Sequence, residues 1–170
     1  MDTRISRKLS IFDEISGDII SYTGGYGLKF FLRAIFFSPG FLVLLNYRFY
    51  SRLYGRTSTK ILGRILWRLN IIFSGCHISP KSTLGVGVLL PHPVAVVIGD
   101  GVIVGDNCTI YQSVTIGASR KDKLTYPELR SNCIVYANSV VVGKIVLNPG
   151  TVVPACSFIS ERNFNDYSKK

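Results

Sequence analysis

The chain contains two histidines, and one of them stands where an imidazole could act as a general base. His92 lies between two prolines, in a short segment that interrupts a regular pattern of aliphatic residues. An imidazole ionises near neutral pH, so an exposed histidine is suited to removing a proton from a hydroxyl nucleophile. A second interpretation stays open, in which His92 is an ordinary surface residue.

Cysteine spacing argues against a metal centre. No Cys-x-x-Cys pair occurs among the four cysteines, which are Cys76, Cys108, Cys133 and Cys156. Structural zinc sites draw on closely spaced ligands, and unpaired cysteines are typical of a reducing compartment. Residues 1–20 are polar and charged and lack the apolar core of a signal peptide. We therefore expect a cytoplasmic protein without a metal ion.

The elements that would position His92 follow from a six-residue repeat. Aliphatic residues recur at this interval in three runs, which are 78–90, 98–116 and 129–159. A short fixed period is typical of a β-helix, in which each hexapeptide forms one short strand with its aliphatic side chain inward. Thirteen repeats at three per turn predict about four coils of parallel strands. A sandwich of short strands, the alternative, would not keep so constant a period.

The repeat is interrupted twice, and both interruptions carry residues suited to chemistry. Two extra residues separate Leu90 from Ile98, and seven separate Ile116 from Leu129. Because the sides of a coil pair with the coils above and below, extra residues must project outward. We therefore expect functional residues in these two segments, His92 among them.

Residues 1–74 have the pattern of a basic helical region. Helices are predicted over 28–37, 41–54 and 59–73, and 1–18 is either poorly ordered or a short amphipathic helix. The net charge is +10, and nine Lys or Arg but no Asp or Glu occur between Asp18 and Asp100. The predicted organisation is a basic helical region (1–74), a β-helix (75–161) and a polar tail (162–170).

The β-helical part resembles serine acetyltransferases and, more broadly, the left-handed β-helix acyltransferases with hexapeptide repeats. The resemblance covers about residues 74–159 and is carried by the run from His77 to His92, by VVIGD at 96–100 and by IYQSVTIG at 110–117. It implies a left-handed parallel β-helix, a homotrimer with active sites at the subunit interfaces, and acetyl-CoA as the donor. It also assigns to His92 the general base that deprotonates an acceptor hydroxyl, which then attacks the thioester directly.

Departures from the family pattern concern the acceptor. The family's Asp before the catalytic histidine is replaced by Pro91, and its substrate-gripping Arg-His-Pro by Thr125-Tyr126-Pro127. A free amino acid would lose its charge-assisted contacts in such a site, so we expect a different acceptor. The family's orienting Asp becomes His77, which either orients His92, contacts substrate or caps the first coil. Tyr126 either orients the acceptor hydroxyl or packs on a neighbouring subunit.

The resemblance also implies that the coenzyme lies in the groove between adjacent β-helices. Small residues along its pantetheine arm and basic residues near its phosphates would be Gly117, Ala118, Ala137, Ala155, Arg120, Lys121, Lys123 and Lys144. Taken singly, each basic residue is more often an ordinary solvated side chain.

The helical region also indicates a membrane surface. Arginines and lysines recur every four residues from Arg48 to Arg68, among ten aromatic residues and without acidic partners. This composition suits an anionic membrane interface, although the longest apolar stretch, 30–45, is too short to span one. The PGF turn at 39–41 with Tyr47-Arg48 resembles N-terminal segments of acetyltransferases of surface-polysaccharide assembly. We expect peripheral contact with the inner membrane through 28–73, against the alternative of a helical cap in water, and no binding of nucleic acid.

These interpretations together predict an acetyl-CoA-dependent O-acetyltransferase. Its acceptor would be a sugar hydroxyl of a bacterial capsule, O-antigen or exopolysaccharide, either in the polysaccharide or on a lipid-linked intermediate. Two alternatives stay open: a serine acetyltransferase with an altered pocket, and a non-catalytic β-helix that acts as a membrane-associated scaffold.

Overall fold

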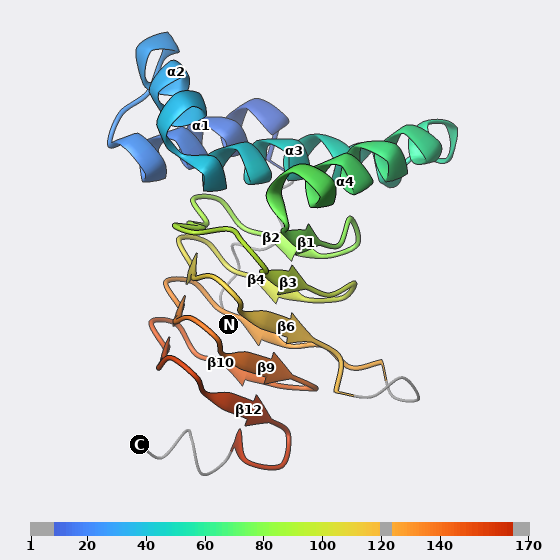
Figure 1. Ribbon diagram of the computed structural model, residues 1–170, viewed down its shortest axis with the longest axis vertical. Helices are drawn as coiled ribbons and strands as arrows, with labels where there is room; N and C mark the ends of the chain where they lie inside the picture. The colour runs from blue at the N-terminus through green and yellow to red at the C-terminus, as the bar shows by residue number, and fades with distance from the viewer. Residues whose placement is uncertain (1–8, 120–123, 165–170) are drawn as a thin grey trace.

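A computed structural model describes residues 9–119 and 124–164, and it shows a helical cap above a coil of short strands (Figure 1). The helices are α1 (Ile11–Thr23), α2 (Leu28–Phe37), α3 (Pro39–Tyr54) and α4 (Lys60–Ser74). The strands are β1 (His77–Ile78), β2 (Thr83–Leu84), β3 (Val97–Ile98), β4 (Ile103–Val104), β5 (Thr109–Ile110), β6 (Thr115–Gly117), β7 (Glu128–Leu129), β8 (Ile134–Val135), β9 (Val140–Val142), β10 (Val146–Leu147), β11 (Val152–Val153) and β12 (Phe158–Ser160). The three helices predicted from the sequence correspond to α2, α3 and α4.

The helix ends follow the local sequence. A capping box between Ser10 and Asp13 begins α1, because each side chain pairs with the other residue's backbone N–H. Proline occupies the first turn of α3, where its missing N–H costs no intrahelical bond, and Gly55 follows the end of that helix. Gly75, at φ +63°, ends α4 and turns the chain into the first strand.

Three parallel sheets form the sides of a triangular coil. Side A consists of β1, β3, β6, β9 and β12, side B of β2, β4, β7 and β10, and side C of β5, β8 and β11. The register stacks one repeat aliphatic on the next, as in the series Ile78, Ile98 and Ile116. All thirteen repeat aliphatics are at most 5% exposed, and they fill the interior of the coil. The predicted left-handed parallel β-helix of about four coils, preceded by helices, is confirmed.

Two corners of the coil hold residues in left-handed backbone conformation. At the corner that leads into side A, from α4 for the first strand and from side C for the others, these residues are Gly75, Ala95, Ser113, Asn138 and Cys156, all with φ between 57° and 63°. The N–H of Ala95 donates to the Gly75 carbonyl (3.0 Å), and that of Cys156 donates to Ala137 in the same way (2.9 Å). Glycine and asparagine tolerate this conformation, whereas at Ala95 and Cys156 the register of the coil imposes it.

The helical cap closes the first end of the coil. A terminal coil has unpaired backbone groups along its outer edge, because no further strand bonds to them. Four side chains of the cap supply partners at 2.7–2.8 Å: Tyr50 donates to the Ile78 carbonyl, Tyr47 to that of Ser82 and Arg48 to that of Leu84, and Tyr22 accepts from the Leu90 N–H. The cap therefore supplies hydrogen-bond partners to the backbone of the first coil, as a further coil would.

Arg48 and Arg52 correct the prediction of a basic stripe without acidic partners. Arg48 is only 2% exposed, and its guanidinium binds the equally buried Asp18 at 3.0 and 3.1 Å. Burial alone would lower the pKa of Arg48, but hydrogen bonds to Asp18 and the charges of Asp18 and Glu14 raise it above its ordinary value. Arg52 pairs with Glu14 at 2.9 Å. The partners come from α1, which the four-residue spacing alone does not predict.

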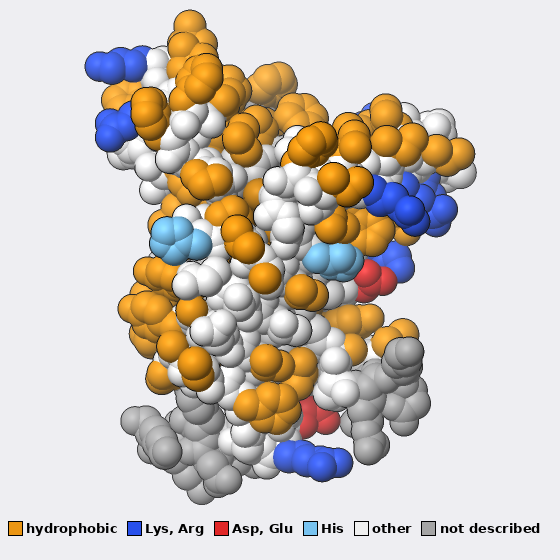
Figure 2. Space-filling model, viewed as in Figure 1, with side chains coloured by type: hydrophobic (Ala, Val, Ile, Leu, Met, Phe, Trp, Pro, Cys, Tyr) orange, Lys and Arg blue, Asp and Glu red, His pale blue; other side chains and the backbone are white. Residues whose placement is uncertain are grey.

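The aromatic residues of the cap divide between its core and its surface. Phe41 and Tyr50 are fully buried, whereas Phe36 and Phe37 are 76% and 79% exposed. Hydrophobic side chains cover much of the visible outer surface of the cap (Figure 2).

The positions of the cysteines predict one reactive thiol. Cys76, Cys108 and Cys133 are buried, and burial raises the pKa of Cys76 to about 12, so its thiolate is scarce at neutral pH. Cys156 is exposed. A thiol-reactive dye should label one cysteine quickly in the native protein and all four in denaturant, and Cys156→Ser should abolish the fast reaction. Fast labelling of a second thiol would contradict the packing of the coil.

Candidate active site

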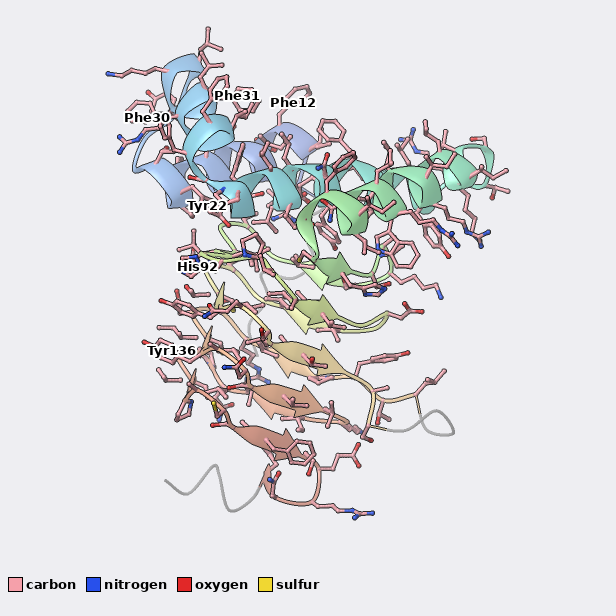
Figure 3. The ribbon with its side chains drawn as sticks, viewed as in Figure 1. Phe12, Tyr22, Phe30, Phe31, His92 and Tyr136 are labelled. Carbon is pink, nitrogen blue, oxygen red and sulfur yellow. The ribbon has the colours of Figure 1, made fainter. Side chains whose placement is uncertain are left out.

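His92 lies in a bulge of the first coil. Ile78 pairs with Ile98, 20 residues further on, whereas Ile98 pairs with Ile116, 18 residues further on. The two extra residues of the first coil lie at the corner between sides C and A, as the interruption of the repeat predicts. The imidazole of His92 is exposed at this edge, just below the helical cap (Figure 3).

The bulge is held firmly on both sides of the histidine. Pro93 is buried, the Ala95 N–H donates to the Gly75 carbonyl, and the Leu90 N–H donates to the hydroxyl of Tyr22. An accessible imidazole on a fixed backbone meets the geometric need of a general base, which must reach a substrate hydroxyl within hydrogen-bond distance.

His77 begins β1 and packs under the cap. Its ring meets Trp67 of α4 edge to face, with 5.2 Å between the ring centroids. Its Nδ1 is buried and has no hydrogen-bond partner among the described residues. Figure 2 shows the two imidazoles as separate pale-blue groups on one face of the molecule. Within one chain, the structure therefore does not bring His77 into hydrogen-bond contact with His92.

Asp100 is a carboxylate near His77 that the sequence analysis did not single out. Hydrogen bonds from Lys81 and Ser79, both 2.7 Å long, hold the pKa of this carboxyl below its ordinary value, and His77 adds a smaller contribution. The available signal was its place at the end of the long stretch without acids. The fold places Asp100 next to β1, through its hydrogen bonds to Ser79 and Lys81.

Tyr126 lies at the opposite edge of side A from His92. It is half-buried, and its ring lies against Gly101, where a Cβ would come within 2.8 Å of ring carbon. The neighbouring Thr125 hydroxyl donates to the Glu161 carboxylate at 3.0 Å. The end of the second interruption is thus fixed against its own chain, and glycine at 101 is needed for the contact with Tyr126.

The predicted coenzyme residues fall at the same two edges. Ala137 and Ala155 precede strands of side A, on the edge of His92, whereas Gly117, Ala118 and Lys144 lie at the ends of such strands or follow them. In the described part of the chain, no atom lies within 4 Å of a Cβ placed on Gly117. Its backbone is therefore open to a ligand. Arg120, Lys121 and Lys123 lie outside the described residues.

Metal ligands do not gather in the described ranges. No group of three or more His, Cys, Asp or Glu there is arranged to hold an ion. His92 offers proton transfer by its exposed imidazole.

In sequence, the chain is similar to serine acetyltransferases. It is 34% identical over 129 residues to that of Synechococcus elongatus, covering 75% of this chain and 52% of the relative. It is 38% identical over 117 residues to that of Synechocystis sp., covering 68% and 47%. The chain thus spans about half the length of these curated relatives. No family model matches it.

In fold, the chain is similar to solved serine acetyltransferase structures. A serine acetyltransferase in complex with CoA aligns with a TM-score of 0.76 at 21% identity, covering 88% of this chain and 61% of that one. At this identity, the likeness shows the fold.

The expected sugar acceptor is wrong on these findings. The relatives are named for serine acetylation, which favours the alternative acceptor that the sequence left open. Pro91 and the 125–127 segment led to the opposite conclusion, because lost contacts show that a pocket has changed without showing what it binds.

Proposed function

Because the chain belongs to the serine acetyltransferase family of hexapeptide-repeat acyltransferases, we propose that it transfers the acetyl group of acetyl-CoA to the hydroxyl of L-serine. The observation that carries the proposal is His92, an exposed imidazole on a fixed bulge of the β-helix, at the position that the resemblance assigns to the general base.

The reaction needs one base and no redox partner. His92 takes the hydroxyl proton of the acceptor as its oxygen attacks the thioester carbonyl carbon. A carbon–oxygen bond forms, the carbon–sulfur bond breaks, and the proton on the imidazole passes to the departing CoA thiolate. The products are O-acetylserine and CoA.

Acetyl-CoA would bind along the open backbone of the coil. Gly117 has free space beside it in the described residues, Ala137 is half-buried and Ala155 is exposed, so the residues present leave room for a pantetheine arm. Lys144 is exposed and free to reach a phosphate, as ordinary surface lysines are.

The family resemblance implies a homotrimer, and the placement of the predicted site residues in one chain supports active sites between subunits. His92 and Tyr126 lie at opposite edges of side A, so one chain does not assemble both around a substrate. A second copy that places its Tyr126 edge beside the His92 edge of the first would complete the site. Sedimentation equilibrium should then give the mass of three chains of 18.8 kDa, and a monomer with full activity would contradict this arrangement.

The direct test measures CoA thiol release with acetyl-CoA and L-serine, with mass spectrometry of the product. We expect serine-dependent release and O-acetylserine, and no release with L-alanine, which lacks the hydroxyl. Release that does not depend on L-serine would overturn the acceptor. Calorimetry without any binding of CoA would instead favour the non-catalytic scaffold.

Pro91 offers a gain-of-function test of the acceptor. The resemblance places a carboxylate there for the substrate ammonium group, so Pro91→Asp should lower the KM for L-serine by about 10- to 100-fold, the range of one charge-assisted hydrogen bond. Pro91→Asn, similar in size but uncharged, should change the KM far less. An unchanged KM in Pro91→Asp would show that the ammonium group lies elsewhere.

A further inference from the structure

The outward face of α4 is its apolar face. Along this helix, Ile61, Ile65, Ile72 and Phe73 are 74%, 50%, 73% and 84% exposed. At 100° per residue these positions fall within about 120° of one another. The buried residues on the opposite side are Gly63 and Asn70. A helix that only capped a water-soluble coil would have the reverse arrangement, with its apolar face inward.

α2 repeats the pattern. Leu28, Leu32 and Phe36, four residues apart, form one stripe that is 73%, 45% and 76% exposed. We call these exposed side chains of α2 and α4 the cap face. Figure 2 shows hydrophobic side chains along the outer surface of both helices.

Unpaired cations border the cap face. Lys29 and Arg33 lie beside the stripe of α2, and Lys60, Arg64 and Arg68 lie along one edge of the stripe of α4. Glu14 and Asp18, the acids of the cap that form ion pairs, are occupied by Arg48 and Arg52. None of the five bordering cations has an ion pair within the described ranges, although Lys60 and Arg64 contact the ring of Tyr54. On α4, Figure 2 shows the basic side chains below the hydrophobic ones, toward the coil.

We propose that the cap face docks on an anionic membrane surface, with its apolar side chains among the acyl chains and its cations at the lipid phosphates. Exposed apolar surface bordered by cations matches the interface of such a bilayer, where long basic side chains reach the headgroups. A second copy of the chain fits less well, because two cap faces would bring their unpaired cations together.

Docking of this kind is peripheral. In the part of the chain that the structure describes, no single helix is long and apolar enough to cross a bilayer. α2 and α3 together have the necessary length and composition, but the pair is bent by 109°. The cap face lies at the end of the molecule away from the last coil, so docking leaves the sides of the coil uncovered (Figure 1).

The test is co-sedimentation of the full chain with lipid vesicles. We expect binding to vesicles of phosphatidylcholine with phosphatidylglycerol, weaker binding at high salt, and little binding to phosphatidylcholine alone. Arg33→Gln with Arg68→Gln should weaken binding by about fivefold per cation removed. Phe36→Ser with Phe73→Ser should weaken it by about tenfold or more. All four side chains are exposed, so circular dichroism should show an unchanged fold.

Phe158→Ser is the matched control, because Phe158 is 61% exposed on β12 at the other end of the coil. It should leave vesicle binding unchanged. Failure to bind anionic vesicles would overturn the proposal, as would binding that both double variants leave intact. Loss of an oligomer in Phe36→Ser with Phe73→Ser, with no vesicle binding by the parent chain, would show that a second copy covers the face.

Discussion

His92→Ala should lower kcat for acetyl transfer by about 10²–10⁴, the range that a positioned general base contributes. The side chain is exposed, and the backbone of its bulge is fixed by the bonds at Leu90 and Ala95. Fold and acetyl-CoA affinity should therefore be kept while turnover is lost. The measurement is CoA thiol release at saturating acetyl-CoA and L-serine, together with calorimetric titration of CoA.

Val94→Ala is the matched control for this variant, because Val94 is 61% exposed in the same bulge but carries no titratable group. It should retain near-normal turnover. His77→Ala distinguishes the roles of the two histidines. If His77 only packs on Trp67, this variant should lower the free energy of unfolding and change kcat little. Near-normal turnover by His92→Ala would remove the general base from the proposed mechanism.

Arg48→Met should lower the free energy of unfolding by about 3–5 kcal/mol, the usual cost of leaving one member of a buried ion pair alone. Asp18 would remain 1% exposed with its counter-ion gone, and the Leu84 carbonyl would lose its donor. Denaturant unfolding followed by circular dichroism, at fixed protein concentration, measures the effect.

Arg52→Met is the comparison for Arg48→Met. Arg52 is 36% exposed, so its pair with Glu14 is largely screened by water and should contribute no more than about 1 kcal/mol. Adding Asp18→Asn to Arg48→Met should recover part of the loss, because a neutral amide oxygen still accepts the bond from the Gly87 N–H. Equal losses in Arg48→Met and Arg52→Met would contradict the burial of this network.

The coil could be predicted from the sequence because one physical rule governs all of it. Each inward position must be filled by an aliphatic of similar size, so a fixed period reports the register directly, as Ile98 and Ile116 show. The bulge at His92 was predictable for the same reason, since the period lengthens there. The left-handed backbone conformation could be predicted at Asn107 and Asn132, because asparagine favours it. At Ala95 the residue type gives no such indication.

The helices α2, α3 and α4 of the cap were predicted, but their packing could not be predicted in the same way. Arg48 and Arg68 stand in the same four-residue series, yet one is buried against α1 and the other is exposed. Only the packing of α1 on α3 separates them. The contact of Trp67 with His77 likewise joins the cap to the coil, and no local pattern records it. The acceptor was misjudged because Pro91 shows a lost contact and no local pattern supplies its replacement.

The bonds from Tyr47, Arg48 and Tyr50 to the first coil also bear on self-association. Coils that stack head to tail on other molecules would build an open filament, and this growth needs two free complementary ends. In this chain the leading end is occupied by its own side chains. The cap therefore blocks the stacking of another coil on this end, so the coils of separate molecules do not join head to tail into an open filament.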